Sequence, residues 1–407
     1  MATAVPPAAT GPAHVAVVSF LAARAAPTGG FWIALAGGVA LARVAERRGA
    51  RLGFGASAAA MLETVAIIGP ARFGVPLTQA LSAPLLGRLH ARRAPLWLQL
   101  LACAAIRLLH NAATTAFFIW VIAGGLDAYA GTYDAIGRRV GIEVGTADAL
   151  ALTLAGLLGW AVFASTVQVL VYRRGLRAWE EAPAAEAVPA NGGDESEPAS
   201  RRRFDPRAIA VAAAVAFVLL LSSTAWPLLA AVSAWLALAW VLSRPEHDPV
   251  PAGVLFAAIL AAGAFAFALG GGLGLDTALR RAGRAALLVL AATWLRAAAG
   301  AAGLREVSRR VLGRLRRIPS ATEAAEVLDG IASEGRLAAA GRSLAARLSE
   351  APKRPLALLD AVLAWVIREA AAFRPPAPAL PLPLSARAAD WALMGAAALP
   401  ALALVVA

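Results

Sequence analysis

Four polar residues share one face of an apolar stretch at residues 97–123. Arg107, His110, Asn111 and Thr114 stand at i, i+3, i+4 and i+7, which places them on one side of a helix. A charged side chain within a stretch long enough to cross a membrane normally faces a cavity or a partner, because lipid cannot solvate it. We therefore expect a binding site for a small anionic or hydrogen-bonding molecule here.

A structural ion pair accounts for the same arginine equally well. Glu63, in the apolar stretch 52–69, is the expected partner of Arg107 in that case. Glu63, Arg72 and Gln79 are also candidates for the wall of the ligand cavity. Both interpretations of the arginine remain open, and they are compatible with each other.

Residues 124–146 are expected to form an external loop. Tyr129, Tyr133 and Asp134 within it are either a lid over the binding site or part of an ordinary solvated connection.

Motifs of the common enzyme classes are absent from the sequence. It contains no Gly-rich phosphate loop of the P-loop type, no His-Glu-x-x-His and only one cysteine, Cys103. We therefore expect no catalytic residue, no cofactor and no metal ion. Acid–base catalysis within the membrane by Glu63 and His110 is the enzymatic alternative.

The composition requires a membrane. Of the 407 residues, 60% are apolar and only 15% are charged, whereas soluble domains carry about 25% charged residues. The net charge of +13 comes from short arginine runs between apolar segments, a pattern typical of cytoplasmic loops facing anionic lipid. The chain is therefore expected to bind the lipid bilayer and no nucleic acid. Its Arg- and Ala-rich composition favours a multi-pass protein of a bacterial plasma membrane.

The apolar stretches predict an all-α polytopic protein with about ten or eleven transmembrane helices. The range 1–177 is expected to form a six-helix membrane domain, and 178–203 a disordered cytoplasmic linker rich in Ala, Pro and Glu. The range 204–407 forms a second membrane domain. It includes amphipathic cytoplasmic helices at 304–370, where an apolar stripe alternates with arginines. The predicted stretches are 13–25, 29–43, 52–69, 72–88, 97–123, 147–172, 207–222, 225–243, 250–273, 282–303 and 388–407.

The second half resembles a known family. The phrase Phe204-Asp205-Pro206-Arg207 precedes two short apolar helices, and two longer spans, an Arg-rich helical region and a last span follow. This order is similar to that of the transmembrane T component, of the CbiQ type, of energy-coupling factor (ECF) transporters. The resemblance covers about 204–407 and implies cassette ATPase subunits as partners.

In that family, Ala-Arg-Gly-like motifs on the coupling helices dock into ATPase grooves. The nearest phrases here are Gly335-Arg336-Leu337, Gly341-Arg342-Ser343 and Ala346-Arg347-Leu348. The resemblance therefore implies Arg336, Arg342 and Arg347 as ATPase-coupling residues.

The first half would then occupy the place of a substrate-binding S component, by architecture alone. The predicted function is a permease subunit of an ECF-type ABC transporter, not itself an enzyme, which takes up a small vitamin-like molecule or a metal. Its candidate substrate-binding residues are Glu63, Arg107, His110, Asn111 and Thr114. The alternative is a membrane enzyme, or a signalling scaffold that recruits a partner through its Arg-rich helices.

Overall fold

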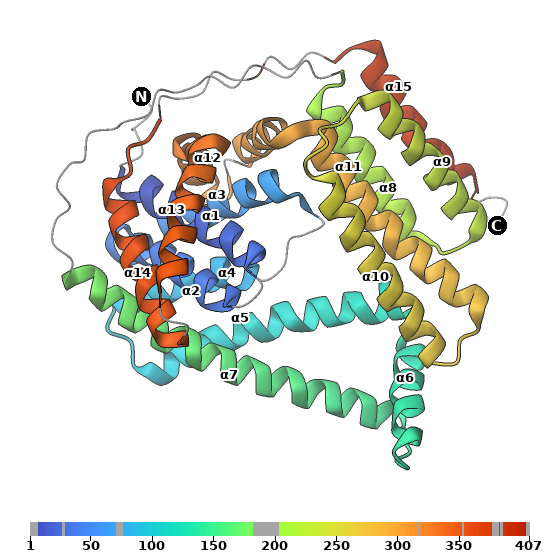
Figure 1. Cartoon of the computed structure of the whole chain (residues 1–407), viewed down its shortest axis with the longest axis horizontal. Coiled ribbons are helices and arrows are strands. Elements are labelled where there is room, and N and C mark those ends of the chain that lie inside the picture. The colour runs from blue at the N-terminus through green and yellow to red at the C-terminus, as the bar shows by residue number, and fades with distance from the viewer. Residues whose placement is uncertain are drawn as a thin grey trace.

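A computed structural model describes residues 7–26, 29–70, 76–181, 203–315, 317–351, 354–376, 382 and 386–403 (Figure 1). Helices make up 86% of these residues, and none of them lies in a strand, so the predicted all-α class is confirmed. The predicted linker falls outside the described residues from 182 to 202. Residues 178–181 form the last turn of α7.

Most of the connections between helices are short. Several helices end next to a glycine, such as Gly49, Gly69 and Gly124, where the helical backbone is interrupted. In chain order they are α1 (Pro7–Ala25), α2 (Gly30–Arg48), α3 (Ala50–Ile68), α4 (Pro76–Ala91), α5 (Leu96–Phe117) with a π-helical turn η2 (Phe118–Ala123), α6 (Leu126–Arg139), α7 (Thr146–Glu181), α8 (Pro206–Ser222), α9 (Trp226–Ser243), α10 (Val250–Gly270), α11 (Leu275–Arg314), α12 (Ala321–Gly330), α13 (Glu334–Glu350), α14 (Pro355–Ala372), α15 (Ala388–Ala398) and a 3-10 turn η3 (Leu399–Leu402).

Helices from both halves of the chain form one unit, which we call the mixed bundle: α1 to α4 together with α12 to α14 (Figure 1). Phe20 of α1 and Leu41 of α2 are fully buried at its centre, and Leu328 of α12 and Leu344 of α13 belong to the same apolar core. The predicted cytoplasmic helices therefore bury their apolar stripe against the N-terminal helices. The ranges on either side of the linker are not two separately packed bodies.

Close packing in the mixed bundle depends on small residues. A Cβ atom added to Gly87 of α4 would stand 2.0 Å from the carbonyl oxygen of Ala42 in α2, so the two backbones touch.

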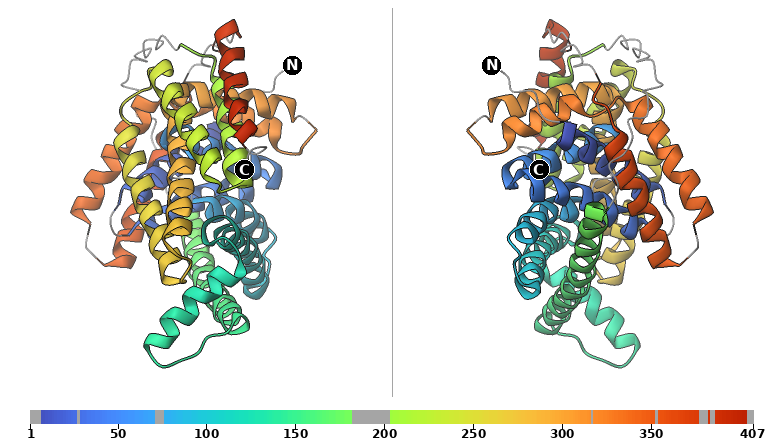
Figure 2. Two further views of the ribbon diagram at one scale, coloured as in Figure 1. Left: turned by 90° about the vertical axis from the view of Figure 1, so that its right-hand side faces the viewer. Right: turned by 90° about the vertical axis from the view of Figure 1, so that its left-hand side faces the viewer.

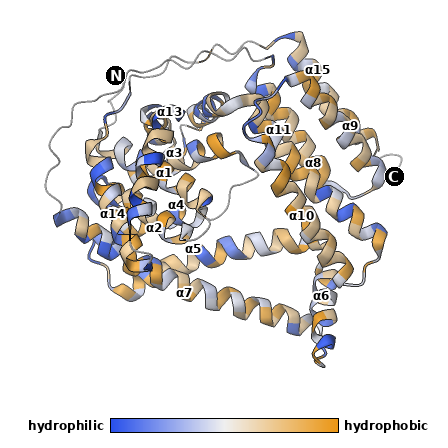
Figure 3. Cartoon of the chain, viewed as in Figure 1, coloured by the Kyte–Doolittle hydropathy of each residue, from blue (hydrophilic) through white to orange (hydrophobic). Residues whose placement is uncertain are grey.

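The remaining helices carry a lipid-like exterior. Large exposed apolar side chains gather on α5 to α11 and on α15, where Leu109, Val241 and Trp391 are each more than 60% exposed. Figure 3 colours much of these helices as hydrophobic. In the mixed bundle, by contrast, the described large apolar side chains that stand exposed are Phe54, Leu81 and Leu356. Apolar surface of this extent is solvated by a bilayer, not by water.

Among the described residues, six helices are long and apolar enough to cross a membrane, which supports a multi-pass protein. They are α3, α5 with η2, α7, α9, α10 and α11, and the shorter helices α8 and α15 with η3 are also apolar. The expectation of about ten or eleven spans also counted α1, α2 and α4. α1 and α2 are apolar because other helices surround them, and the hydropathy of such a helix equals that of a span.

The apolar helices run between two sides of the molecule. The mixed bundle lies at one side, and the α8–α9 turn, the α10–α11 turn and α6 lie at the other (Figure 1). α6 projects beyond the other helices at the bottom of both views in Figure 2. The segment predicted as an external loop, 124–146, is therefore largely the helix α6 with its two connections.

A backbone break divides α11 into a membrane part and an arm. Gly300 has φ 65° and ψ 163°, a conformation that only glycine adopts without strain. One turn before the break, the carbonyl of Ala297 accepts a hydrogen bond of 2.9 Å from the backbone N–H of Glu246. The arm beyond Gly300 leads into the mixed bundle.

Candidate functional site

The polar face of α5 faces α4 and α7 at its centre. Arg107 is 4% exposed there, and its Nη2 donates a hydrogen bond of 2.6 Å to Oε1 of Gln168 on α7. Gln168 Nε2 donates in turn to Oγ of Ser82 on α4 at 2.6 Å, and the Ser82 hydroxyl donates to the carbonyl of Thr78. Cys103 Sγ lies 3.4 Å from Gln168 Oε1 and donates weakly to it. We call Ser82, Cys103, Arg107 and Gln168 the Arg107 cluster.

The charge of Arg107 is not neutralised within the part of the chain that the structure describes. No ion pair between described residues includes Arg107, and its neighbour in the cluster is a neutral amide. Charged side chains at membrane depth cost several kcal/mol and ordinarily pair with an opposite charge. The cluster therefore holds an uncompensated positive charge.

Several buried polar atoms around the cluster have no hydrogen-bond partner among the described residues. Arg107 Nε and Asn111 Nδ2 are donors, the Ser165 and Tyr172 hydroxyls can donate or accept, and Gln79 Oε1 is an acceptor. Buried polar groups are normally paired, so unpaired donors beside a cation are suited to an anionic group.

Tyr172 reaches this region only because α2 carries a glycine at position 38. A Cβ atom there would stand 1.7 Å from the Tyr172 hydroxyl oxygen.

The predicted pairing of Arg107 with Glu63 is wrong. Glu63 is 2% exposed and accepts a hydrogen bond of 2.6 Å from Nε of Arg305, on the arm of α11. Arg305 also donates to the carbonyl of Ala332, before α13. The physical reason is that α3 packs with α11 and α12, while the face of α5 that bears Arg107 is turned to α4 and α7. Glu63 therefore does not line the Arg107 cluster.

The other predicted residues divide between two places. Asn111 is half-buried on the cluster side, and His110 is also half-buried. Thr114 is exposed, its hydroxyl donates to carbonyls of its own helix, and it lines a cavity of about 480 Å³. Arg72 lies outside the described residues.

This cavity, which we call the α6-end pocket, is lined by aromatic side chains and hydroxyl groups. Tyr129 and Tyr133, expected to lie in a loop, are on α6, where the Tyr129 hydroxyl is 2.6 Å from Thr153 Oγ1 of α7. Phe118 begins the π-helical turn that follows α5 and packs edge-on against Phe267 of α10. Asp134 accepts from the backbone of Val144 and pairs with Arg138, so it does not point into this pocket as a free charge. One face of α5 thus links this pocket to the Arg107 cluster.

Sequence reasoning missed the α7 half of the cluster, although the signal was present. Ser165, Gln168 and Tyr172 stand at i, i+3 and i+7 in an apolar stretch, the same spacing that revealed Arg107 on α5.

The arginines expected to contact an ATPase have different surroundings on α13, which is continuous from Glu334 to Glu350. Arg336 donates to the carbonyl of Arg374 at 2.9 Å, and its guanidinium lies 5.8 Å from the Phe373 ring. Arg342 and Arg347 are exposed and line separate grooves, with α1 and with α14 respectively. Among the three, these two are available to a partner.

Two arginines join α11 to the mixed bundle. Arg296 is 5% exposed; its Nε donates to the carbonyl of Ile67 at 2.7 Å and its Nη1 pairs with Glu246 at 2.8 Å. Together with the Arg305–Glu63 pair, this forms what we call the hinge latch, on either side of Gly300. The two parts of α11 are therefore each tied to α3, one by a hydrogen bond to a carbonyl and the other by an ion pair.

The phrase at 204–207 has a structural role in this chain. The Asp205 carboxylate caps α8 by accepting from the Arg207 backbone N–H at 2.8 Å, and its backbone N–H donates to Asp390 of α15 at 2.7 Å. The hydrogen bond from the Arg207 side chain holds the pKa of Asp205 below its usual value. The phrase thus ties the starts of α8 and α15 together.

No group of three or more His, Cys, Asp or Glu side chains suited to a metal ion occurs in the described ranges. Compared with known proteins, the chain matches no family model, no curated protein and no solved structure.

Proposed function

We propose that this protein is a permease subunit of the bacterial plasma membrane that takes up a small molecule bearing an anionic group. ATP would be hydrolysed by separate cassette subunits, as in the ECF transporters that the second half resembles. The observation that carries the proposal is the buried Arg107 guanidinium, hydrogen bonded to the neutral side chain of Gln168.

A carboxylate supplied by a ligand would meet the unpaired groups around Arg107. It would accept from Arg107 Nε and from Asn111 Nδ2, both buried donors without partners among the described residues, and would compensate the charge. Charge-assisted bonds of this kind are stronger than neutral ones, which favours an anionic molecule over a neutral one at this site. The α6-end pocket, reached along the same face of α5 through Thr114, would be the entry.

Coupling would start at α13 and reach the membrane through the hinge latch. Arg342 and Arg347 are exposed for a partner protein, while the apolar face of α13 is held in the mixed bundle. A tilt of α13 would act on Arg305 and Arg296, which join α11 to α3 across Gly300.

The first test identifies the small molecule that is bound to the purified protein. Full-length protein is purified from native membranes in mild detergent, and small molecules released from it are identified by mass spectrometry. We expect an acidic compound on the wild-type protein and on Thr166→Val, a control on α7 whose hydroxyl bonds its own helix. Arg107→Met and Asn111→Ala should lose that compound. If both variants retain the compound, or if the wild-type protein carries none, the proposed anion site is refuted.

The second test asks which protein co-purifies with the chain through α13. A cassette ATPase should accompany the wild-type protein and Arg314→Glu, an exposed control, and should be lost from Arg342→Glu and Arg347→Glu. Loss of a different protein from the same two variants would favour the signalling-scaffold alternative. Association that survives both reversals would show that docking does not use α13.

A further inference from the structure

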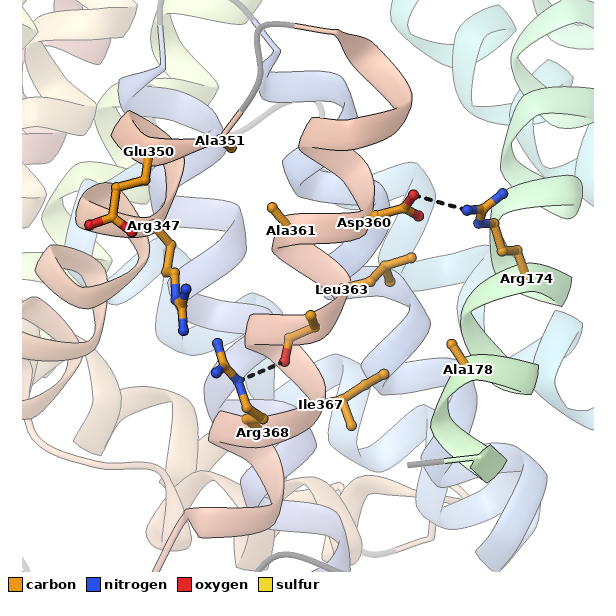
Figure 4. Close-up of a pocket in the computed structure, with 11 residues that line it drawn as sticks. Arg174, Ala178, Arg347, Glu350, Ala351, Asp360, Ala361, Leu363, Ile367 and Arg368 are labelled. Atoms are coloured by element: carbon orange, nitrogen blue, oxygen red, sulfur yellow. Dashed lines mark hydrogen bonds and ion pairs between the residues drawn. The ribbon is translucent and has the colours of Figure 1, made fainter. Parts of the chain in front are cut away.

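A groove on the outer surface of the mixed bundle combines positive charge with an apolar floor. It lies between α7, α13 and α14 and encloses about 720 Å³ (Figure 4). That volume lies in the range of small-molecule sites, which run from about 300 to 1,000 Å³. The groove uses none of the residues of the Arg107 cluster.

Like charges converge on this groove from two helices. Arg347 of α13 and Arg368 of α14 extend toward one another across it in Figure 4. Neither forms an ion pair with a described residue, and Arg368 Nε makes one bond, to the carbonyl of Ala364 on its own helix. Two guanidinium groups repel each other unless an anion lies between them.

The carboxylates nearby do not supply that anion. Asp360 pairs with Arg174 of α7 at 2.9 Å on the other side of the groove. Glu350 forms no ion pair with a described residue, and in Figure 4 its side chain is turned away from Arg368. The mouth of the groove between Arg347 and Arg368 is therefore positively charged.

The floor is apolar. Leu363 and Ile367 are 3% and 9% exposed, and alanines such as Ala361 and Ala178 line the groove beside them. A ligand that fits both features has a compact anionic head and an apolar or flat body.

We propose that this groove binds an organic phosphate. The phosphate lies between Arg347 and Arg368, whose forked guanidinium groups match its oxygens, and the body of the molecule rests on Leu363 and Ile367. Two kinds of molecule supply such a phosphate group: a soluble nucleotide in the cytoplasm and the headgroup of an anionic phospholipid. The site goes beyond the proposed transport function but shares Arg347 with the proposed ATPase contact, so it is tested by binding to the protein alone, without an ATPase.

The test measures binding to the full-length protein directly, without transport. AMP serves as the soluble probe in isothermal titration calorimetry of protein in nanodiscs of phosphatidylcholine, with inorganic phosphate as the head-only probe. We expect saturable AMP binding, weaker binding of inorganic phosphate, and about a ten- to hundredfold loss in Arg347→Gln and Arg368→Gln, because each removes charge-assisted hydrogen bonds. Arg314→Gln, exposed but outside the groove, should bind as the wild type does.

The lipid source is tested by adding phosphatidic acid to the nanodiscs. If the site takes a lipid headgroup, phosphatidic acid protects the protein against thermal unfolding in the wild type and in Arg314→Gln but not in Arg347→Gln or Arg368→Gln. If it takes a soluble phosphate, AMP alone shows this dependence. The proposal is overturned if neither probe binds, or if the two groove variants bind both as the control does.

Discussion

Replacing Gln168 with Leu removes the amide oxygen that accepts a hydrogen bond from the Arg107 side chain. The guanidinium is 4% exposed and donates to Gln168 Oε1 at 2.6 Å. Leucine has a similar volume but accepts nothing, so the variant keeps the packing between α5 and α7 and leaves a buried guanidinium without this hydrogen bond. The Gln168–Ser82 bond, also 2.6 Å, is lost at the same time.

The expected cost follows from these contacts. A hydrogen bond to a charged group contributes about 1.5–3 kcal/mol, and a neutral hydrogen bond contributes about 1 kcal/mol. We therefore expect Gln168→Leu to lower the free energy of unfolding by about 3 kcal/mol. Adding Arg107→Met should restore at least about half of that loss, since replacing both partners of a buried bond with apolar groups is close to neutral.

The assay is a double-mutant cycle. Purified variants are unfolded by adding sodium dodecyl sulfate to mixed micelles, and helix content is followed by far-ultraviolet circular dichroism. Thr166→Val on the same helix, whose hydroxyl bonds the carbonyl of Val162, is the matched control and should change the free energy by less than about 1 kcal/mol. Additive effects of Gln168→Leu and Arg107→Met, or a Gln168→Leu effect no larger than the control, would refute the pairing. A folded double variant also separates the functions of the cluster, since it should keep its stability and lose the anionic compound.

Three further changes test other parts of the fold by the same unfolding assay. Burial lowers the pKa of His14 from 6.5 to about 3, so the folded state resists protonation, and the stability present above pH 6.5 is lost as the pH falls. From pH 8 to pH 5 the free energy of unfolding of the wild type should therefore fall by about 2 kcal/mol more than that of His14→Phe, and equal losses would contradict this. Arg305→Met leaves the Glu63 carboxylate buried without its partner and should cost about 3–5 kcal/mol, most of it recovered in Arg305→Met/Glu63→Leu; no recovery would mean that the pair is not coupled. Gly300→Ala should cost about 1–3 kcal/mol because alanine is strained at φ 65°, while Gly313→Ala on the same helix, with open space around it, should be neutral or stabilising; similar effects would place the break elsewhere.

The polar face of α5 was predictable because spacing on a helix is a local property. Arg107 and Asn111 lie on one side of any helix that contains them, and the structure places both at the α5 interface with α4 and α7. Thr114 lies on the same helix a turn further and leaves the cluster because α5 and α7 separate toward α6 (Figure 1). Local spacing gave the candidates, and packing selected among them.

The partner of Glu63 was not predictable by the same reasoning. Glu63 and Arg305 are 242 residues apart in the chain, and nothing in either segment marks the other as its partner. Which face of α3 meets which helix depends on the packing of the mixed bundle, where small residues such as Gly55 of α3 allow α12 to approach closely.

The amino-acid sequence alone determines that this chain is helical and that much of it is solvated by lipid, since composition and periodicity are properties of each segment by itself. It also determines the amphipathic stripe of α13 and the charge-bearing face of α5. Only the tertiary structure decided which apolar helices face lipid and which face protein. An apolar helix such as α1 has the same hydropathy whether lipid or the side chains of α2, α13 and α14 surround it, and only the assembled fold distinguishes the two.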